Sequence, residues 1–375
     1  MSHSPWLVNY SYFYPVVFLR IILFPVSLLY GFLIYIRNKL FDWKIIPSKS
    51  YPVPVISIGN LSTGGTGKTP HVEYVIRLLE PDYKVATLSR GYKRKTKGFL
   101  LADTQTGVPD IGDEPYQFYS KFPDIKVAVD SSRARGIDSL MKLDSPPEVI
   151  LLDDAFQHRH VKPGLSILLT DFYKLYTQDY ILPSGNLREF RTGARRADII
   201  VITKSPKVLS PITRRRLQET IRPQSGQKVF YSYIQHGNFT AIPGVNFLPG
   251  KPTEFATALL VAGIANPYPL EMFLKDKSYK VETLLFPDHH QFTAKDVEIM
   301  IDRFDNLFAK NKIIVTTEKD MMRLKQIDLL KMIKNLPLCY VPIRMKFHKQ
   351  DEAAFDQIIL DYVKRAKGDN PIHTT

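Results

Sequence analysis

The sequence predicts an α/β fold, with a mostly parallel sheet flanked by helices, a smaller C-terminal α/β domain and one apolar N-terminal helix. Beyond residue 50, short apolar runs alternate with stretches of helical periodicity, which is typical of βαβ units. Before residue 40, a single apolar run stands alone. The 375 residues suffice for about two domains, and they contain no internal repeat.

The composition narrows the class of protein. Hydrophobic residues make up 44% of the chain and charged residues 23%, which excludes a mainly disordered, collagen-like or polytopic membrane protein. The single cysteine, Cys339, excludes a disulfide scaffold and a cysteine-based zinc site, and it favours a reducing compartment. The net charge of +14 favours anionic partners, namely nucleic acid, anionic lipid or phosphorylated substrates.

The N-terminal segment, residues 1–40, is expected to form a membrane-associated helix. Its apolar run, Val16–Ile36, contains Arg20 and Pro25 and is barely long enough to span a bilayer. It also suits a helix that lies in the membrane interface, and a buried core helix is the alternative. Cations follow the run, so a spanning helix would leave the rest of the chain in the cytoplasm.

Residues 41–228 are expected to form the larger domain. Helical patterns cover Lys68–Leu79 and the stretch around Arg133–Met141. Because strands alternate with such helices, we expect a parallel sheet. Its strand candidates are Val53–Ile58, Lys84–Leu88, Ile125–Val129, Val149–Leu152, Leu165–Thr170 and Ile199–Thr203.

Residues 229–253 are expected to be a linker or hairpin, and residues 254–375 the smaller α/β domain. Val229–Ile234 is a further strand candidate, followed by a stretch rich in turn residues. The smaller domain has strand candidates Thr257–Val261, Lys280–Leu285, Ile313–Thr316 and Leu338–Pro342, with helices around Pro269–Lys275, Ala294–Phe308 and Asp351–Arg365.

The most informative segment is PVPVISIGNLSTGGTGKTPHVEYVIRLL, residues 52–79. An apolar strand leads into a glycine-rich loop, and a helix begins at its end, where backbone N–H groups bind phosphate as in a P-loop. Ser62 stands where the strict motif has its first glycine, so the loop is nearer to the Gly-Gly-x-Gly-Lys-Thr form. Lys68 is expected to reach the β- and γ-phosphates, and Thr69 to bind Mg²⁺. The expected phosphate-binding residues are Ser62, Thr63, Gly64, Gly65, Thr66, Gly67, Lys68 and Thr69.

Acidic pairs are candidates for the remaining chemistry. Asp153 and Asp154 follow a strand in LLDDAFQHR and are expected to help hold Mg²⁺, although such a pair can also be a helix cap. Asp113 and Glu114 stand between Gly and Pro in IGDEPYQF, which by itself favours a capped helix start.

Two further segments carry candidate residues. LPSGNLREFRTGARRAD is a loop rich in arginine, including Arg188 beside Glu189, and it suits either phosphate binding or a solvated basic surface. In FPDHHQF, His289 follows Asp288, so it can be a tuned base, an orienting group or a metal ligand, although a surface histidine pair without function is commoner. No other His or Cys lies at metal-ligand spacing, which disfavours zinc.

Together, these segments resemble one family, the tetraacyldisaccharide 4'-kinases of the lipid A pathway in Gram-negative bacteria. The combination of GNLSTGGTGKTP, DDAFQH and DHHQF is specific to that family. The resemblance runs from about residue 57 to residue 324, so it covers most of the chain. The matching segments are SIGNLSTGGTGKTP, LSRGYKRK, GDEPYQF, VAVDSSRARG, ILLDDAFQHR, LPSGNLRE, RADIIVITK, VAGIANP, FPDHHQFT and VTTEKDMMRL.

The resemblance implies an activity and a place. ATP and Mg²⁺ would serve transfer of the γ-phosphoryl group to the 4'-hydroxyl of tetraacyldisaccharide 1-phosphate, giving lipid IVA. Members of the family act at the cytoplasmic face of the bacterial inner membrane, anchored by the N-terminal helix. They have a larger P-loop domain and a smaller C-terminal domain, with the active site between them.

The resemblance also implies residue roles. Asp113 would be the catalytic carboxylate that takes the acceptor's proton, and His289 its partner from the second domain. Thr69, Asp153, Asp154 and Glu189 would be the metal ligands. Other active-site positions are Glu114, Arg133, Gln157, His158 and Arg188.

Two rival functions share parts of this pattern. A membrane-associated P-loop ATPase acting on a protein partner would keep the phosphate loop without needing Asp113 or His289. A nucleic-acid-dependent ATPase would use the basic stretches Arg90–Lys97 and Thr213–Arg216, but the apolar N-terminus and the absence of a known nucleic-acid-binding motif argue against it. We therefore expect no nucleic acid and no obligate protein partner.

Overall fold

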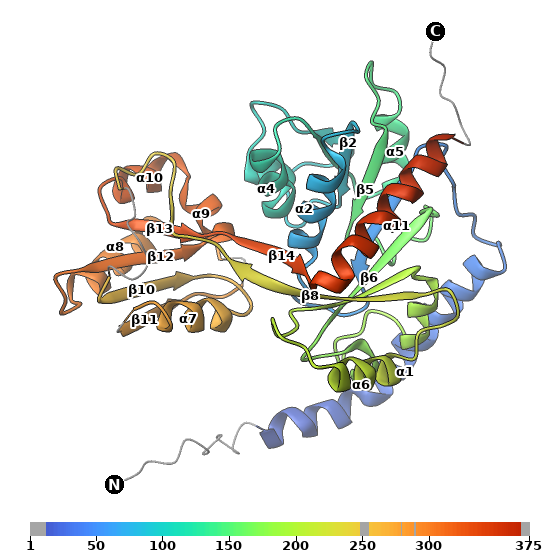
Figure 1. The fold of residues 1–375 in the computed structure, drawn as a ribbon, viewed down its shortest axis with the longest axis horizontal. Coiled ribbons are helices and arrows are strands. Elements are labelled where there is room, and N and C mark those ends of the chain that lie inside the picture. The colour runs from blue at the N-terminus through green and yellow to red at the C-terminus, as the bar shows by residue number, and fades with distance from the viewer. Residues whose placement is uncertain (1–12, 248–254, 279, 289, 369–375) are drawn as a thin grey trace.

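The protein consists of a larger and a smaller α/β domain joined by strands β8 and β14 (Figure 1). The computed structural model describes residues 13–247, 255–278, 280–288 and 290–368. The larger sheet has the strand order β14-β8-β7-β6-β1-β5-β2-β4-β3, and the smaller has the order β11-β10-β12-β13-β9. The α/β fold predicted from the sequence is confirmed.

The larger sheet is parallel in its centre, and its two edge strands, β3 and β14, are antiparallel to their neighbours. The six predicted strands of this sheet all form. The strands are β1 (Val55–Asn60), β2 (Val85–Ser89), β3 (Leu100–Leu101), β4 (Lys126–Val129), β5 (Val149–Asp153), β6 (Leu165–Asp171), β7 (Ile199–Thr203), β8 (Lys228–His236) and β14 (Ile343–Phe347).

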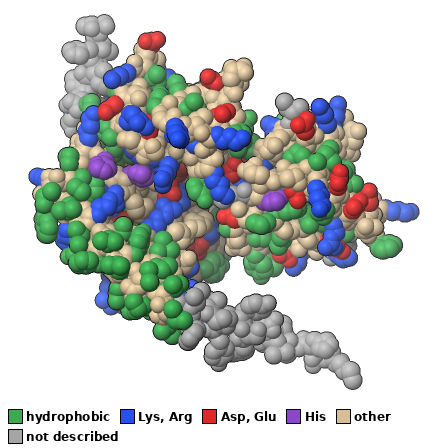
Figure 2. Space-filling model, turned by 180° about the vertical axis from the view of Figure 1, so that it is seen from behind, with side chains coloured by type: hydrophobic (Ala, Val, Ile, Leu, Met, Phe, Trp, Pro, Cys, Tyr) green, Lys and Arg blue, Asp and Glu red, His purple; other side chains and the backbone are tan. Residues whose placement is uncertain are grey.

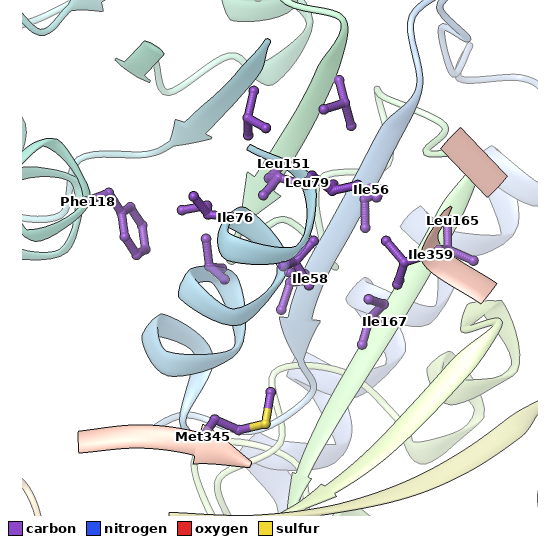
Figure 3. Packing of buried hydrophobic residues seen from close by; sticks show 14 of the residues in the cluster. Ile56, Ile58, Ile76, Leu79, Phe118, Leu151, Leu165, Ile167, Met345 and Ile359 are labelled. Atoms are coloured by element: carbon purple, nitrogen blue, oxygen red, sulfur yellow. The ribbon is translucent and has the colours of Figure 1, made fainter. Parts of the chain in front are cut away.

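Helices cover both faces of the larger sheet. One face packs against α2 (Lys68–Leu79), α4 (Asp113–Lys121) and α11 (Lys349–Gly368). The other face packs against α5 (Arg133–Leu140) and α6 (Pro211–Ile221). Figure 3 shows side chains from the core on the first face. Its core includes Ile56 and Ile58 of β1, Ile76 and Leu79 of α2, Phe118 of α4 and Ile359 of α11.

Helix α11 belongs to the larger domain, whereas the sequence pattern places it in the smaller one. Phe355, Ile359 and Val363 are buried in the same core as α2. The Tyr362 hydroxyl donates to the backbone oxygen of Val55, over 3.2 Å. An amphipathic pattern reveals that a helix has an apolar face, but it does not reveal which sheet that face covers. For this reason, the range expected for the smaller domain, residues 254–375, includes a helix that packs on the larger one.

The smaller domain is a five-stranded sheet with helices on both faces. Its four predicted strands form, and β9 adds an antiparallel edge strand. The strands are β9 (Thr240–Ala241), β10 (Thr257–Ala262), β11 (Lys280–Leu285), β12 (Lys312–Thr317) and β13 (Leu338–Val341); the helices are α7 (Tyr268–Lys275), α8 (Ala294–Asp305), α9 (Glu318–Leu324) and α10 (Ile327–Ile333).

Strand β8 connects the two domains and pairs differently along its length. Lys228–Tyr231 pairs in parallel with β7 of the larger sheet. The rest of the strand, Ser232–His236, pairs antiparallel with Ile343–Phe347 of β14. The chain therefore enters the smaller domain on β8 and returns on β14, which the sequence pattern does not reveal. Residues 248–254, at the end of the expected linker, lie outside the described residues.

Helix α1 (Phe13–Asp42) lies along the larger domain with an exposed apolar side. From Arg20 onward it is long and apolar enough to cross a membrane by length and composition, yet little of it is buried inside the protein, which argues against a core helix. The Ser27 hydroxyl donates to the Ser184 hydroxyl over 2.8 Å and holds the other side of the helix on the domain. Figure 2 shows the hydrophobic side chains gathered on the lower part of the larger lobe, with Lys and Arg side chains above them.

Candidate active site

The phosphate loop lies between β1 and α2, where the sequence predicts it. Gly64 and Gly67 have φ angles of 99° and 86°, which glycine adopts without strain. Gly67 caps α2, so the first N–H groups of that helix face the loop. A Cβ atom placed on Gly64 or Gly65 would meet no atom within 4 Å, so open space surrounds this part of the loop. Such a loop can enclose a phosphate chain.

Neighbouring strands hold the phosphate loop in shape. Thr66 is buried, and its hydroxyl accepts a hydrogen bond of 2.8 Å from the Asn60 side-chain amide. The Thr203 hydroxyl, at the end of β7, donates to the Thr66 backbone oxygen over 2.8 Å. The Thr63 N–H donates to the Asn186 backbone oxygen over 2.7 Å. The loop is therefore preorganised by β1, β7 and the loop that carries Arg188.

Asp153 and Asp154 lie at the carboxyl end of β5, directly beside β1. The Lys68 ammonium lies 3.7 Å from Asp154 Oδ2, and the Arg188 guanidinium donates to Asp154 Oδ1 over 2.8 Å. Asp154 has a φ angle of 48°, and its backbone N–H donates to the Ile58 oxygen over 3.0 Å. The structure thus brings Lys68, Asp154 and Arg188 together at the end of the phosphate loop.

Asp153 is buried and incompletely hydrogen-bonded. Its Oδ2 accepts from the Ser89 hydroxyl over 3.3 Å, whereas its Oδ1 has no hydrogen-bond partner. Burial raises the pKa of Asp153 to about 7, and the charges of Glu114 and Asp154 add to that rise. A buried carboxylate oxygen without a donor beside a phosphate loop is a suitable ligand for a hard cation.

Glu114 connects the phosphate loop to the smaller domain. Its Oε1 accepts from the Thr69 hydroxyl over 3.1 Å and from the Lys319 ammonium over 2.9 Å. The positive charge of Lys319 lowers the pKa of Glu114 to about 2, with help from Lys68 and despite burial. Glu114 is therefore ionised at neutral pH, and it joins α2, α4 and α9.

Asp113 is the first residue of α4, which confirms the helix start but not a side-chain cap, because the N-cap residue is Gly112. Asp113 also faces the smaller domain. Its Oδ2 accepts from Arg323 Nε over 3.0 Å and from Arg323 Nη2 over 2.5 Å. Arg323 lies on α9 and its side chain is 1% exposed. The residue pair Asp113–Glu114 is thus bound by two cations of α9, one turn apart.

Arg133, Gln157 and His158 surround the two aspartates. Arg133 is buried and donates to the backbone oxygen of Asp153 over 3.2 Å, and burial lowers its pKa to about 10, so it remains a cation. The Gln157 amide donates to the Asn60 backbone oxygen over 2.9 Å. Burial and the nearby Arg133 lower the pKa of His158 to about 4, which makes it neutral at pH 7.

Glu189 lies behind this layer and is already paired. Its Oε1 accepts from Arg196 over 2.7 Å and from Gln157 over 3.2 Å. Its Oε2 accepts from the Asn38 amide of α1 over 2.8 Å. As a metal ligand, Glu189 stays a prediction, and these contacts favour a part in fixing α1 and Gln157.

The segment FPDHHQF supplies the second histidine candidate. His289 is outside the described residues, so its role as a catalytic partner stays a prediction. The neighbouring His290 stacks on Phe286 and contacts Asp296 over 3.0 Å, and Asp296 caps α8 together with Thr293. His290 is therefore part of a helix start.

Sequence reasoning missed Lys319, Asp320 and Arg323. They lie in the segment VTTEKDMMRL, which was matched to the family without a role for any residue. A local signal exists: Thr317 followed by Asp320 is typical of a helix N-terminus, and Lys319 and Arg323 are then one turn apart on one face. That signal could predict the helix, but not its carboxylate partners 205 and 210 residues away in the sequence.

Comparisons with known proteins settle the family. The family model described as tetraacyldisaccharide-1-P 4'-kinase matches residues 19–364. This chain belongs to that family. The tetraacyldisaccharide 4'-kinase of Parabacteroides distasonis is 46% identical and aligns over 94% of this chain and 96% of its own length. That of Flavobacterium johnsoniae is 47% identical over 92% of this chain and 98% of its own.

A solved structure agrees. LpxK from Aquifex aeolicus, in complex with ATP, is 30% identical, with a TM-score of 0.69 over 92% of this chain and 99% of that one. The kinase class predicted from the sequence is therefore confirmed. The likeness also covers both domains, since 92% of this chain exceeds either domain alone.

Proposed function

We propose that this tetraacyldisaccharide 4'-kinase family member transfers the γ-phosphoryl group of ATP to the 4'-hydroxyl of tetraacyldisaccharide 1-phosphate, forming lipid IVA. The observation that carries the proposal is the position of Asp113 and Glu114. Glu114 contacts Thr69 of the phosphate loop, and Asp113 is the adjacent residue at the domain junction. The proposed phosphate site and the proposed carboxylate for the acceptor hydroxyl thus lie next to each other.

The residues at the loop fit Mg²⁺. Thr69 supplies a hydroxyl, Asp153 an unpartnered buried oxygen, and Asp154 a second carboxylate. Mg²⁺ prefers one or two carboxylates together with water and phosphate oxygens, so this small donor set suffices. When bound, the ion would neutralise charge on the phosphates. We assign these three residues to the ion and leave Glu189 a supporting part.

The protein's own groups have separate tasks in the transfer. Lys68 and Arg188 place positive charge where the phosphoryl oxygens carry negative charge, which is the main requirement of phosphoryl transfer. Asp113 takes the proton of the acceptor hydroxyl while the oxygen of that hydroxyl bonds to the γ-phosphorus. The bond from the γ-phosphorus to the β–γ bridging oxygen breaks, and ADP leaves. His289 assists Asp113 from the smaller domain. General-base assistance of this kind contributes about 10²–10⁴-fold to the rate.

Helix α1 supports a lipid acceptor at the cytoplasmic face of the inner membrane. Its exposed side chains include Ile22, Leu29 and Leu33, each more than half exposed. Its opposite side is bound to the loop of Arg188, because the Tyr30 hydroxyl donates to the Arg188 backbone oxygen over 3.0 Å. The loop that carries Arg188 therefore contacts both α1, through Tyr30, and the candidate phosphate site, through Asp154. Since α1 lies along the domain, we favour insertion in the interface over a full span.

The decisive experiment follows the phosphate. The protein is incubated with γ-labelled ATP, Mg²⁺ and detergent-dispersed tetraacyldisaccharide 1-phosphate, beside Asp113→Ala and the control Asp124→Ala, which changes an exposed carboxylate just after α4. We expect label in the lipid with the parent and Asp124→Ala, and a loss of about 10² or more with Asp113→Ala. Full labelling by Asp113→Ala would remove its assigned role. ATP hydrolysis without lipid label would instead favour an ATPase acting on a protein partner.

The membrane assignment has its own test. Flotation with vesicles containing anionic lipid should recover the parent protein, and Leu29→Glu/Leu33→Glu should reduce that recovery, because two carboxylates would enter the apolar interface. Unchanged flotation would refute attachment through α1. The double variant should keep its melting temperature, since both side chains are exposed.

A further inference from the structure

The domain junction contains a ladder of ion pairs between α4 and α9. Arg323 pairs with Asp113, Lys319 with Glu114 over 2.9 Å, and Lys121 with Glu318 over 2.8 Å. The first two pairs lie at the phosphate loop and the third lies at the far end of α4. One helix of the smaller domain therefore contacts the whole length of the helix that begins with Asp113.

Arg323 is unusual among these cations because its own position is fixed. Its Nη1 donates to Asp320 Oδ1 over 2.9 Å and to the Gly263 backbone oxygen over 3.1 Å. Its Nε and Nη2 both contact Asp113 Oδ2. The planar guanidinium thus serves two carboxylates at once, which a lysine ammonium at this place could not do with the same geometry.

Asp320 is fixed in turn by the smaller sheet. It is fully buried, and its Oδ2 accepts from the Gly263 N–H over 2.9 Å and from the Thr317 hydroxyl over 2.7 Å. A Cβ atom on Gly263 would lie 3.2 Å from Asp320, so glycine allows this close approach. Gly263 directly follows β10, and Thr317 is the last residue of the adjacent strand β12. The path from the smaller sheet to Asp113 is therefore continuous and made of buried groups.

We propose that Arg323 is a positioning residue for the phosphoryl transfer: through it, the smaller domain holds the Asp113 carboxylate of the larger domain in its reactive orientation. The proposal rests on the function proposed above, in which Asp113 takes the acceptor's proton. It explains why a buried arginine side chain reaches across the junction. It also makes the reaction depend on the Arg323–Asp113 pair between α9 and α4, whereas nucleotide binding by the larger domain does not depend on that pair.

The test is a double-variant cycle of Arg323→Lys and Asp113→Asn, with Glu318→Gln as the matched control on the same helix. We expect Arg323→Lys to lower kcat for lipid phosphorylation by about 10–100-fold, because a small misplacement of a reacting group has an effect of that size. The affinity for ATP, measured by direct binding, should change less than about twofold. Glu318→Gln should keep kcat within about threefold, since it alters only the remote pair.

The cycle separates positioning from general stability. If Arg323 acts through Asp113, then Arg323→Lys should lower kcat by less than about threefold once Asp113→Asn is present. An equal loss in both backgrounds, or an Arg323→Lys variant with parental kcat, would overturn the proposal. If Asp113→Asn alone kept full activity, the result would refute the proposed role of Asp113 as the base, and the role of Arg323 that rests on it.

A second variant covers the case in which Arg323→Lys does not fold. Asp320→Asn keeps the Arg323–Asp113 pair and removes one charge that fixes the guanidinium. We expect a smaller drop in kcat that also vanishes in the Asp113→Asn background, with ATP binding unchanged. A drop in kcat that persists in that background would count against the path from the smaller sheet to Asp113.

Discussion

The two domains build their halves of the candidate active site in different ways. The larger domain presents its candidate phosphate-binding groups on one continuous segment, with Gly64, Gly67, Lys68 and Thr69 in six residues. The smaller domain contributes Lys319 and Arg323, whose partners stand some two hundred positions earlier in the chain. Local chain geometry is enough to make the first half, whereas the second half exists only where α4 and α9 meet. Under the proposed function, the charge of the substrate is therefore bound by one domain, whereas Asp113, the proposed base, is held by contacts from both.

Among the variants that test this difference between the two domains, we expect the largest loss of activity from a change at Lys68. Lys68→Ala removes a cation beside Asp154 and the phosphate loop, and we expect lipid phosphorylation to fall by about 10²–10³-fold together with weaker ATP binding. Steady-state kinetics and direct ATP binding measure both. Lys49→Ala, which removes an exposed lysine paired with Asp138, should leave both unchanged. Parental ATP affinity in Lys68→Ala would contradict the assignment.

A smaller effect is expected on the other side, at Lys319. Lys319→Ala leaves Glu114 without its interdomain partner, and we expect kcat to fall by roughly tenfold because a partly buried charge loses its counterion. ATP affinity should change less than in Lys68→Ala. The control is Lys331→Ala, an exposed lysine of the same domain. Equal losses of ATP affinity at Lys68 and Lys319 would break the distinction between the two halves.

A third prediction concerns stability and pH. The folded-state pKa of Asp153, about 7, lies above its ordinary value of 3.8. Its contribution to the free energy of unfolding is therefore fully present below about pH 4 and is lost as the pH rises through 7. Asp153→Asn should therefore melt at a higher temperature than the parent at pH 8 without Mg²⁺. The difference should narrow toward pH 5, as measured by differential scanning calorimetry. A lower melting temperature for Asp153→Asn at pH 8 would contradict the cost of burying this charge.

The smallest predicted effect compares two adjacent glycines. Gly64 has a φ angle of 99°, whereas Gly65 has no positive φ, and both have open space around them. Gly64→Ala should lower the free energy of unfolding by about 1 kcal/mol, because an L-residue is strained at such a φ. Gly65→Ala should leave it unchanged. Denaturant unfolding of both variants measures the difference, and equal destabilisation would show that φ is not the cause.

The sequence predicted those features that depend on neighbours in the chain. Short segments are enough to predict the strands, the phosphate loop and the acidic pair after β5, because their periodicity or spacing favours a single structure. The sequence does not predict the contact of Glu189 with Asn38 or that of Asp113 with Arg323. Each joins segments that become neighbours only through the topology of the fold. The assignment of α11 failed for the same reason: its apolar face is evident, but the sheet that it covers is not.

The path of the chain through β8 and β14 has a consequence for how this protein is made. The core beside α2 includes Phe355, Ile359 and Val363, which follow the entire smaller domain in the sequence. During synthesis, the smaller domain is therefore translated before β14 and α11, which complete the larger domain. The smaller domain, contiguous between β9 and β13, can fold as soon as it emerges. A chain interrupted between the two would keep the phosphate loop, α2 and α4 in its sequence but lack the part of the core that α11 supplies.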